Sequence, residues 1–277
     1  MRGFRMSRVL ALSSWVSYGH VGLSAAGPAL QALGHTVTQL PTIVLSNHPG
    51  WPHVSGRQVP VEQLDAMVGA LDDNGWLDGH DAFFTGYLPS PDHVDLAVRI
   101  IDRLRASGGR PRITVDPVLG DDPKGLYLPE PAAIALRDRL VPLADTLTPN
   151  RFELGWLTGL PADTGPQAID AARGLARAYG SQVIVTSPPS PFGRTGALAV
   201  TARTAQRWTL PLGQGVPHGV GDVFAGLIAS GLPVAEALGH LSALIAASLG
   251  APHLRIAETA AGWTGAAPAT PDPIQEF

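Results

Sequence analysis

Short runs of strand-forming residues alternate with helical stretches along most of the chain, and this alternation limits the possible folds. The strand-like runs are residues 8–13, 35–46, 81–88, 112–120, 145–150 and 181–187. The helical stretches between them are residues 23–33, 61–71, 91–106, 131–140 and 167–179. Such alternation is typical of βαβ units, in which helices cover both faces of a parallel sheet. The sequence predicts an α/β fold with three layers, αβα, around a mostly parallel central sheet.

The pattern changes after Ser187, where residues 196–212 read as a hairpin of more exposed strands. Two final helices are expected at 222–230 and 233–249, the second with a regular apolar stripe. No internal repeat or linker divides the chain, so residues 1–277 are expected to form a single domain. Residues 1–7 are expected to be a ragged start, with Met6 as an alternative initiator. Residues 251–277 form a tail rich in Ala, Pro and Gly, whose last ten residues are expected to be loose.

Composition excludes several classes of function. The 277 residues carry a formal net charge of −4, which gives no electrostatic case for binding nucleic acid or an anionic membrane. The chain has no cysteine, so disulfides, thiolate metal sites and a thiol nucleophile are excluded. Because no apolar run approaches the length of a transmembrane helix, a cytoplasmic protein is expected. Lys124 is the only lysine.

Polar residues follow each predicted strand. They are Ser13 and Ser14; Ser46, Asn47 and His48; Thr85 and Tyr87; Asp116; Thr148 and Asn150; and Thr186 and Ser187. Ligands of open parallel sheets bind beyond the carboxyl ends of the strands, so these residues are expected to surround a site. Single members have simpler explanations: Asp116-Pro117 is a common turn, and Asn150 with Glu153 fits a helix capping box.

The segment "HGVGDVFAGLIASG", residues 218–231, permits two interpretations. Asp222 could cap a buried helix whose apolar residues recur at helical spacing. Alternatively, the glycines and the helix N-terminus could form an anion site, with Asp222 taking a proton from a neighbouring group. A short Gly-x-Gly motif does not decide between them.

Six motifs in register resemble those of the pyridoxal kinases of the ribokinase-like superfamily. They are "SWVSYGHVGLSAA" from Ser14, "SNHPGW" from Ser46, "TGYL" from Thr85, "DPVLGD" from Asp116, "TPNRFE" from Thr148 and "GVGD" from Gly219. The resemblance covers nearly the whole chain, from about residue 9 to about residue 249. It implies a ribokinase-like fold, ATP-dependent phosphorylation of the 5′-hydroxymethyl group of pyridoxal, and activity on pyridoxine and pyridoxamine.

The resemblance also implies roles for individual residues. Asp222 would be the general base, and the amides around Gly219, Val220 and Gly221 would hold the transferring phosphoryl group. The pyridoxal contacts would be Ser14, His48 and Tyr87. The residues implied on the ATP side are Asp116, Thr148, Glu153, Thr186 and Ser187. Asp121 and Glu153 would bind Mg²⁺, partly through water, while Asp116, Thr148 and Thr186 match positions that help to hold a monovalent cation. A homodimer is also implied.

Two departures bear on substrate preference. Leu23 stands where the family usually has Asn, and Pro49 stands where it often has Thr. The nearest alternative function is a hydroxymethylpyrimidine kinase of the same superfamily. The two departures also leave open a vitamer-binding protein with little turnover. A Rossmann oxidoreductase is disfavoured because no G-x-G-x-x-G follows the first strand.

Overall fold

A nine-stranded sheet forms the centre of the computed structural model, which describes residues 6–106 and 108–273. The strand order is β11-β10-β9-β8-β5-β4-β1-β2-β3. The strands from β9 to β2 in this order are parallel, whereas β10 is antiparallel to both of its neighbours and β3 is antiparallel to β2. This confirms the α/β fold with a mostly parallel sheet.

The strands of the sheet are β1 (Arg8–Val16), β2 (Thr36–Leu45), β3 (Gly56–Gln58), β4 (Ala82–Thr85), β5 (Arg112–Val115), β8 (Thr146–Leu147), β9 (Gln182–Thr186), β10 (Arg194–Val200) and β11 (Ala205–Pro211). A separate small hairpin pairs β6 (Gly120–Asp121) with β7 (Gly125–Leu126). The helices are α1 (Leu23–Ala32), α2 (Val61–Asp73), α3 (Pro91–Ala106), α4 (Glu130–Ala135), α5 (Arg151–Thr158), α6 (Gly165–Tyr179), α7 (Val220–Ala229), α8 (Val234–Ser248) and α9 (Ala260–Trp263).

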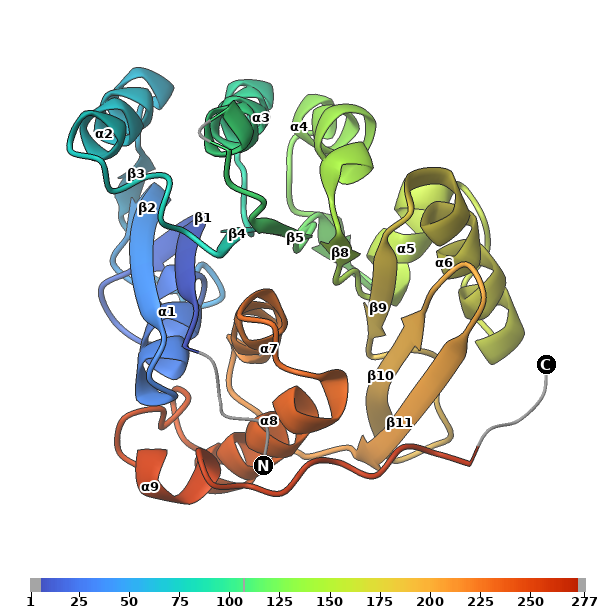
Figure 1. Cartoon of the computed structure of the whole chain (residues 1–277). Coiled ribbons are helices and arrows are strands. Elements are labelled where there is room, and N and C mark those ends of the chain that lie inside the picture. Colours follow the sequence, from blue (N-terminus) through green and yellow to red (C-terminus); the bar gives the residue numbers. More distant parts are fainter. Residues whose placement is uncertain (1–5, 107, 274–277) are drawn as a thin grey trace.

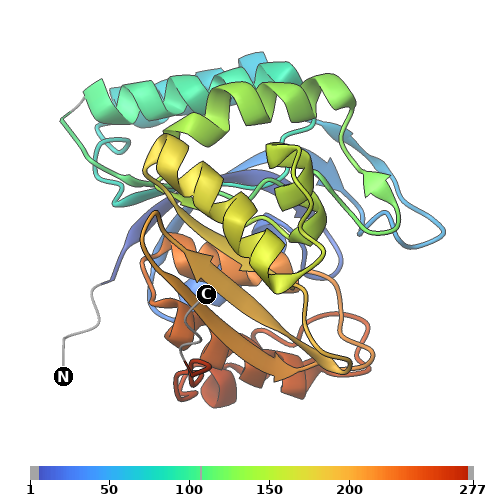
Figure 2. The same cartoon turned by 90° about the vertical axis from the view of Figure 1, so that its right-hand side faces the viewer.

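Helices cover both faces of the sheet, as the alternation predicts (Figures 1 and 2). On one face, α2 to α6 bury a cluster that includes Leu64, Ile100 and Leu154. On the other face, α1, α7, α8 and α9 bury a second cluster, which includes Leu23, Phe224 and Trp263. Two separate apolar layers therefore hold the parallel strands between them, and the carboxyl ends of these strands meet at one edge.

Several boundaries differ from those predicted. The predicted strand 112–120 ends at Val115, because the chain then turns into the β6–β7 hairpin. The predicted helix 131–140 is α4 followed by a π-helical turn over Leu136–Leu140. Ser13 and Ser14 do not follow the first strand. They lie within β1, where a bulge shifts its register against β2 between Ser13 and Trp15.

Both predicted loose ends are better ordered than expected within the described residues. Ser7 is buried and its hydroxyl donates to the Ser230 carbonyl at 2.8 Å. Residues 1–5 of the predicted ragged start lie outside the described part. In the tail, Trp263, which precedes the ten residues expected to be loose, is buried in the core. Within those ten residues, Asp272 bonds to Thr209 of β11. The remaining residues, 274–277, are not described.

Within the described residues, no helix is long and apolar enough to cross a membrane.

Candidate active site

Gly219 begins helix α7 and brings Asp222 into its first turn. Gly219 is the N-cap and has a left-handed backbone, with φ 97°. A Cβ at this position would lie 1.9 Å from the His20 carbonyl oxygen, so only glycine lets the two loops approach this closely. Asp222 is therefore the third residue of the helix, and the prediction that it caps the helix is wrong. Val220 and Gly221 occupy the two positions before it, where backbone N–H groups lack helical partners.

The backbone N–H groups of Gly22 and of Asp222 itself lie near the Asp222 carboxylate and favour its charged form. Burial nevertheless raises its pKa to about 6, because the two amides only partly offset the loss of solvent. A carboxylate with this pKa can hold or release a proton near neutral pH, which suits a general base.

Ser14 lies beside the glycine that supports Asp222. Gly22 has a φ of 56°, and a Cβ there would lie 2.2 Å from the Ser14 carbonyl oxygen and 2.3 Å from Ser14 Oγ. The bulge of β1 carries Ser14 to this contact. The structure thus brings Ser14, Gly22 and Asp222 together from two segments of the sequence. Gly22 was not identified from the sequence, and its place before an apolar helix was the only signal for it.

Asp116 follows β5 and is buried beside other acids. Burial, and then the charges of Glu153 and Asp222, hold its pKa well above the usual range. The Thr148 hydroxyl donates to Asp116 Oδ1 at 2.9 Å. The structure therefore places three other predicted residues, Thr148, Glu153 and Asp222, close enough to Asp116 to act on its carboxylate.

Both oxygens of the Glu153 carboxylate accept hydrogen bonds from backbone donors. Oε1 accepts from the N–H of Leu119 at 2.7 Å, and Oε2 accepts from the N–H of Asn150 at 2.9 Å. Asn150 Oδ1 accepts in turn from the Glu153 N–H, which confirms the capping box at the start of α5. Burial raises the pKa of Glu153 above its usual range. Glu153 thus anchors the 116–120 loop.

Asp121 lies in the β6–β7 hairpin and is exposed. Its Oδ1 accepts from the Asp122 N–H at 2.8 Å. Val118, between Asp116 and Asp121, has a φ of 45°. This conformation is rare for a β-branched residue, and such strain gathers at functional sites. No sequence pattern marked Val118.

Thr186 and Ser187 lie at the carboxyl end of β9. Thr186 pairs with Asn150, and its N–H donates to the Pro149 carbonyl at 2.8 Å. Ser187 also has a left-handed backbone, with φ 47°, and is exposed. The two residues are therefore next to the α5 cap that also holds Glu153.

Tyr87 is held against the end of β1 by its backbone. Its N–H donates to Ser13 Oγ at 3.0 Å, and its carbonyl accepts from the Thr42 hydroxyl at 2.7 Å. Burial raises the pKa of the half-buried Tyr87 phenol. Ser13, which was not among the predicted pyridoxal contacts, thus positions Tyr87.

His48 lies in residues 46–55, which connect β2 to β3 and are called the flap below. Its ring stacks on that of His218 with a centroid distance of 4.0 Å and an interplanar angle of 22°. Burial, then the charges of His218 and Lys124, lower the pKa of His48 to about 4. His48 therefore faces the loop before Asp222. His218 was not among the predicted site residues, because a single histidine beside a glycine carries no pattern.

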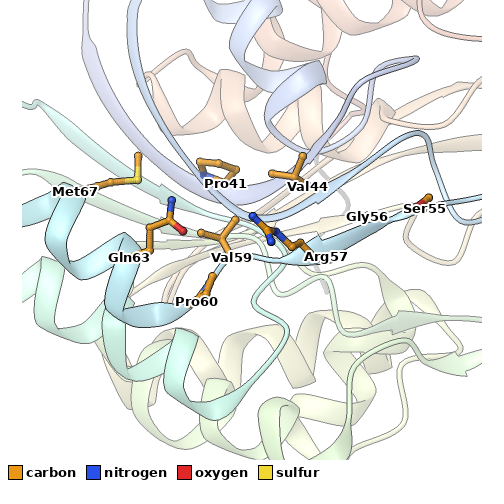
Figure 3. Close-up of a pocket in the computed structure, with 9 residues that line it drawn as sticks. All are labelled: Pro41, Val44, Ser55, Gly56, Arg57, Val59, Pro60, Gln63 and Met67. Atoms are coloured by element: carbon orange, nitrogen blue, oxygen red, sulfur yellow. The ribbon is translucent and has the colours of Figure 1, made fainter.

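A hollow in the described surface lies away from these residues. A cavity of about 610 Å³ occurs at the β2–β3 edge beside α2 (Figure 3). It is lined by Pro41, Val44, Ser55, Gly56, Arg57, Val59, Pro60, Gln63 and Met67. None of the predicted site residues lines it, although Ser55 is the last residue of the flap.

Comparisons with known proteins agree with this arrangement. The family model described as phosphomethylpyrimidine kinase matches residues 29–249. A pyridoxine/pyridoxal/pyridoxamine kinase of Bordetella bronchiseptica is 39% identical over 236 residues, which are 83% of this chain and 83% of the relative. A pyridoxal kinase of Corynebacterium diphtheriae is 33% identical over 222 residues, covering 79% of this chain and 78% of the relative.

A solved structure gives the same result. Pyridoxal kinase from Leishmania donovani, in complex with ADP and ginkgotoxin, superposes with a TM-score of 0.85 at 29% identity. It covers 96% of this chain and all of that one. The family model spans most of the chain, and the sequence and structural relatives agree with it. The chain therefore belongs to the pyridoxal kinase family of the ribokinase-like superfamily.

Proposed function

We propose that this protein transfers the γ-phosphoryl group of ATP to the 5′-hydroxymethyl group of pyridoxal, and also of pyridoxine and pyridoxamine. One observation carries the proposal: the Asp222 carboxylate lies in the first turn of α7, with its pKa raised to about 6 and beside amides that lack helical partners. The chain's relatives include kinases named for these three vitamers.

In the proposed reaction, Asp222 accepts the proton of the attacking hydroxyl. Backbone N–H groups around Gly219, Val220 and Gly221 hold the oxygens of the transferring phosphoryl group, aided by the positive end of the α7 dipole. Phosphoryl transfer requires mainly alignment and charge stabilisation, and this arrangement supplies both. Ser14, His48 and Tyr87 would contact the vitamer, and Thr186 and Ser187 would contact the ATP phosphates.

The residues present are compatible with Mg²⁺ bound chiefly through water and phosphate. Within the described part of the chain, no three acidic or histidine side chains form a ready metal cage. Mg²⁺ usually keeps several waters and takes only one or two protein carboxylates. We propose that Asp121 faces the ion directly and that Glu153, whose oxygens accept backbone bonds, acts through water. The ion would neutralise charge on the phosphates.

A monovalent cation is a further element of the proposal. Burial, and then the charges of Glu153 and Asp222, raise the pKa of Asp116. A cation near Asp116, Thr148 and Thr186 would offset the charges of these carboxylates. The donors are oxygen atoms, which suits a hard cation.

Hydroxymethylpyrimidine kinase activity is the second candidate, because the matching family model bears the description phosphomethylpyrimidine kinase. The two departures from the pyridoxal kinase pattern have different surroundings. Leu23 is fully buried in the core beside α7, so it replaces a polar residue with packing. Pro49 is exposed in the flap.

The test is ATP consumption with pyridoxal, pyridoxine, pyridoxamine and hydroxymethylpyrimidine, each at several concentrations. We expect the highest kcat/KM with pyridoxal and at least a 100-fold loss in Asp222→Asn. Preference for hydroxymethylpyrimidine would favour the second candidate. Binding of the vitamers without turnover by the wild-type protein would favour a vitamer-binding protein.

We further propose that the protein is a homodimer located in the cytoplasm. Light scattering coupled to size-exclusion chromatography would measure the mass, for which a dimer predicts twice the 28.9 kDa of one chain.

A further inference from the structure

His48 and His218 join two segments that are distant in sequence. His48 belongs to the flap, and His218 belongs to the loop between β11 and α7, directly before the Gly219 N-cap. Their rings stack at 4.0 Å. This contact therefore connects the flap with the segment that carries Asp222.

The flap has its own internal hydrogen bonds. Asn47 Nδ2 donates to the His48 and His53 carbonyls at 3.1 Å and 3.0 Å, and the Ser46 N–H donates to the Ser55 carbonyl at 2.7 Å. The Trp51 N–H donates to the His48 carbonyl. These contacts give the flap a defined shape, so the ring pair can position it as a unit.

The tautomer of His48 follows from its surroundings. His48 Nδ1 accepts a hydrogen bond from the Gly50 N–H at 3.0 Å, so this nitrogen carries no proton. A Cβ on Gly50 would lie 2.9 Å from His48 Nδ1 and 3.6 Å from His218 Nε2. Gly50 thus lets the flap backbone approach both rings.

We propose that His218 is a positioning residue, whose stacked ring holds His48 and the flap against the loop before Asp222 while the vitamer is bound. The catalytic part of this inference rests on the proposed function. The structural part, that His218 fixes the flap, does not. No reacting group needs to touch His218, because it acts through His48.

The surroundings of His48 favour its neutral form. The charged or titratable side chains that act on His48 in the described structure are His218 and Lys124, and both lower its pKa, which burial has already lowered, to about 4. A histidine whose pKa is lowered in the closed state favours that state when neutral. Closure therefore weakens as pH falls through the range from 6.5 toward 4.

The test compares His218→Ala with His218→Phe, which keeps a flat ring, and with Gln214→Ala, an exposed position in the same loop, as the control. Amide hydrogen exchange of residues 47–54 is measured without ligand, so this result does not depend on activity. The free energy of a stacked ring pair of this kind corresponds to a change of about 2- to 10-fold in the equilibrium between the held and the released flap. We expect exchange at Gly50 and Trp51 to accelerate by that factor in His218→Ala and to return toward wild type in His218→Phe.

Two further measurements separate positioning from a general loss of structure. The His48 pKa, followed by NMR of its ring protons, should rise in His218→Ala because a repelling partner is lost. The KM for pyridoxal should rise about 2- to 10-fold, with kcat and the KM for ATP changed less than about twofold. Unchanged exchange and an unchanged His48 pKa in His218→Ala would overturn the inference, as would His218→Phe behaving like His218→Ala. If the wild type did not phosphorylate pyridoxal, the exchange and NMR results would still decide the role of His218.

Discussion

At the scale of single residues, Asp222 and Glu153 are both enclosed carboxylates whose oxygens are occupied differently. Glu153 accepts from the backbone of Leu119, Gly120 and Asn150, so its charge holds loops in place. The Asp222 carboxylate is favoured in its charged form by the nearby N–H groups of Gly22 and Asp222, and it lies beside helix amides without helical partners. The first arrangement suits a structural role, and the second leaves a carboxylate able to exchange a proton.

Asp222→Asn should abolish most turnover while leaving the fold intact. Because the folded-state pKa of Asp222 is raised to about 6, the charged form opposes folding above that pH, and this cost disappears as pH falls below about 4. The free energy of unfolding of the variant should therefore exceed that of the wild type by up to about 3 kcal/mol at pH 8, and by less than about 1 kcal/mol near pH 4. Urea denaturation at both pH values measures this, and kcat should fall at least 100-fold. Near-normal turnover would remove Asp222 from the role of base.

Asp121→Ala and Glu153→Ala should separate the effect on Mg²⁺ binding from the effect on protein stability. Asp121 is exposed, so its loss should raise the Mg²⁺ concentration needed for half-maximal rate without lowering stability. Glu153→Ala should also destabilise the protein by about 2 to 3 kcal/mol, because buried N–H groups lose their acceptor. Magnesium titrations with thermal unfolding check both effects. An unchanged titration in both variants would contradict the proposed magnesium site.

At the scale of elements, the periodicity of apolar residues predicted the regular helices and strands well, but it predicted the turns at their ends poorly. Helix α3 has the predicted bounds, Pro91–Ala106, because its apolar stripe is strong and glycines follow it. The start of α7 was predicted at Asp222, since propensity favours Asp over Gly as a cap. The structure instead uses Gly219, because the His20 carbonyl leaves no room for a Cβ. Long-range crowding of this kind leaves no local signal.

Gly22→Ala tests the junction between the β1 bulge and α1, where Gly22 packs against Ser14. The new Cβ would overlap Ser14 atoms, and the φ of 56° would become strained, so the Gly22 N–H would move away from Asp222. We expect at least a 100-fold loss of kcat/KM and about 2 kcal/mol or more of lost stability. Gly174→Ala on the exposed side of α6 is the matched control. No atom lies near its Cβ, so it should gain up to about 1 kcal/mol and keep full activity. Equal behaviour of the two variants would show that the junction is not needed.

At the scale of the whole molecule, the alternation of elements predicted the layers but not the contacts between distant segments. The polar residues after the parallel strands could be predicted to share one edge, since parallel strands end together. The pairing of His48 with His218 could not be predicted, because it depends on how the flap folds back across the sheet edge. The same holds for the tail, whose composition resembles a loose end although Trp263 is 1% exposed.

The segment after α9 connects α8 with β11, and its removal should lower the free energy of unfolding. It runs past α8 to β11 (Figure 1), with the Ala269 N–H donating to the Ala235 carbonyl at 2.7 Å. Asp272 accepts from the Thr209 N–H at 3.0 Å, and its own N–H donates to the Arg207 carbonyl at 2.8 Å.

Each such bond contributes about 1 kcal/mol, partly offset by the entropy of ordering the segment. Deleting residues 266–277 should therefore lower the free energy of unfolding by about 2 kcal/mol in urea titrations, and Asp272→Ala by about 1 kcal/mol. The described residues of the segment form hydrogen bonds with α8, α9 and β11 and with none of the proposed site residues, so kcat at 25 °C should stay within about twofold of wild type. A deletion that left the urea midpoint unchanged would show that these bonds do not hold the two elements together.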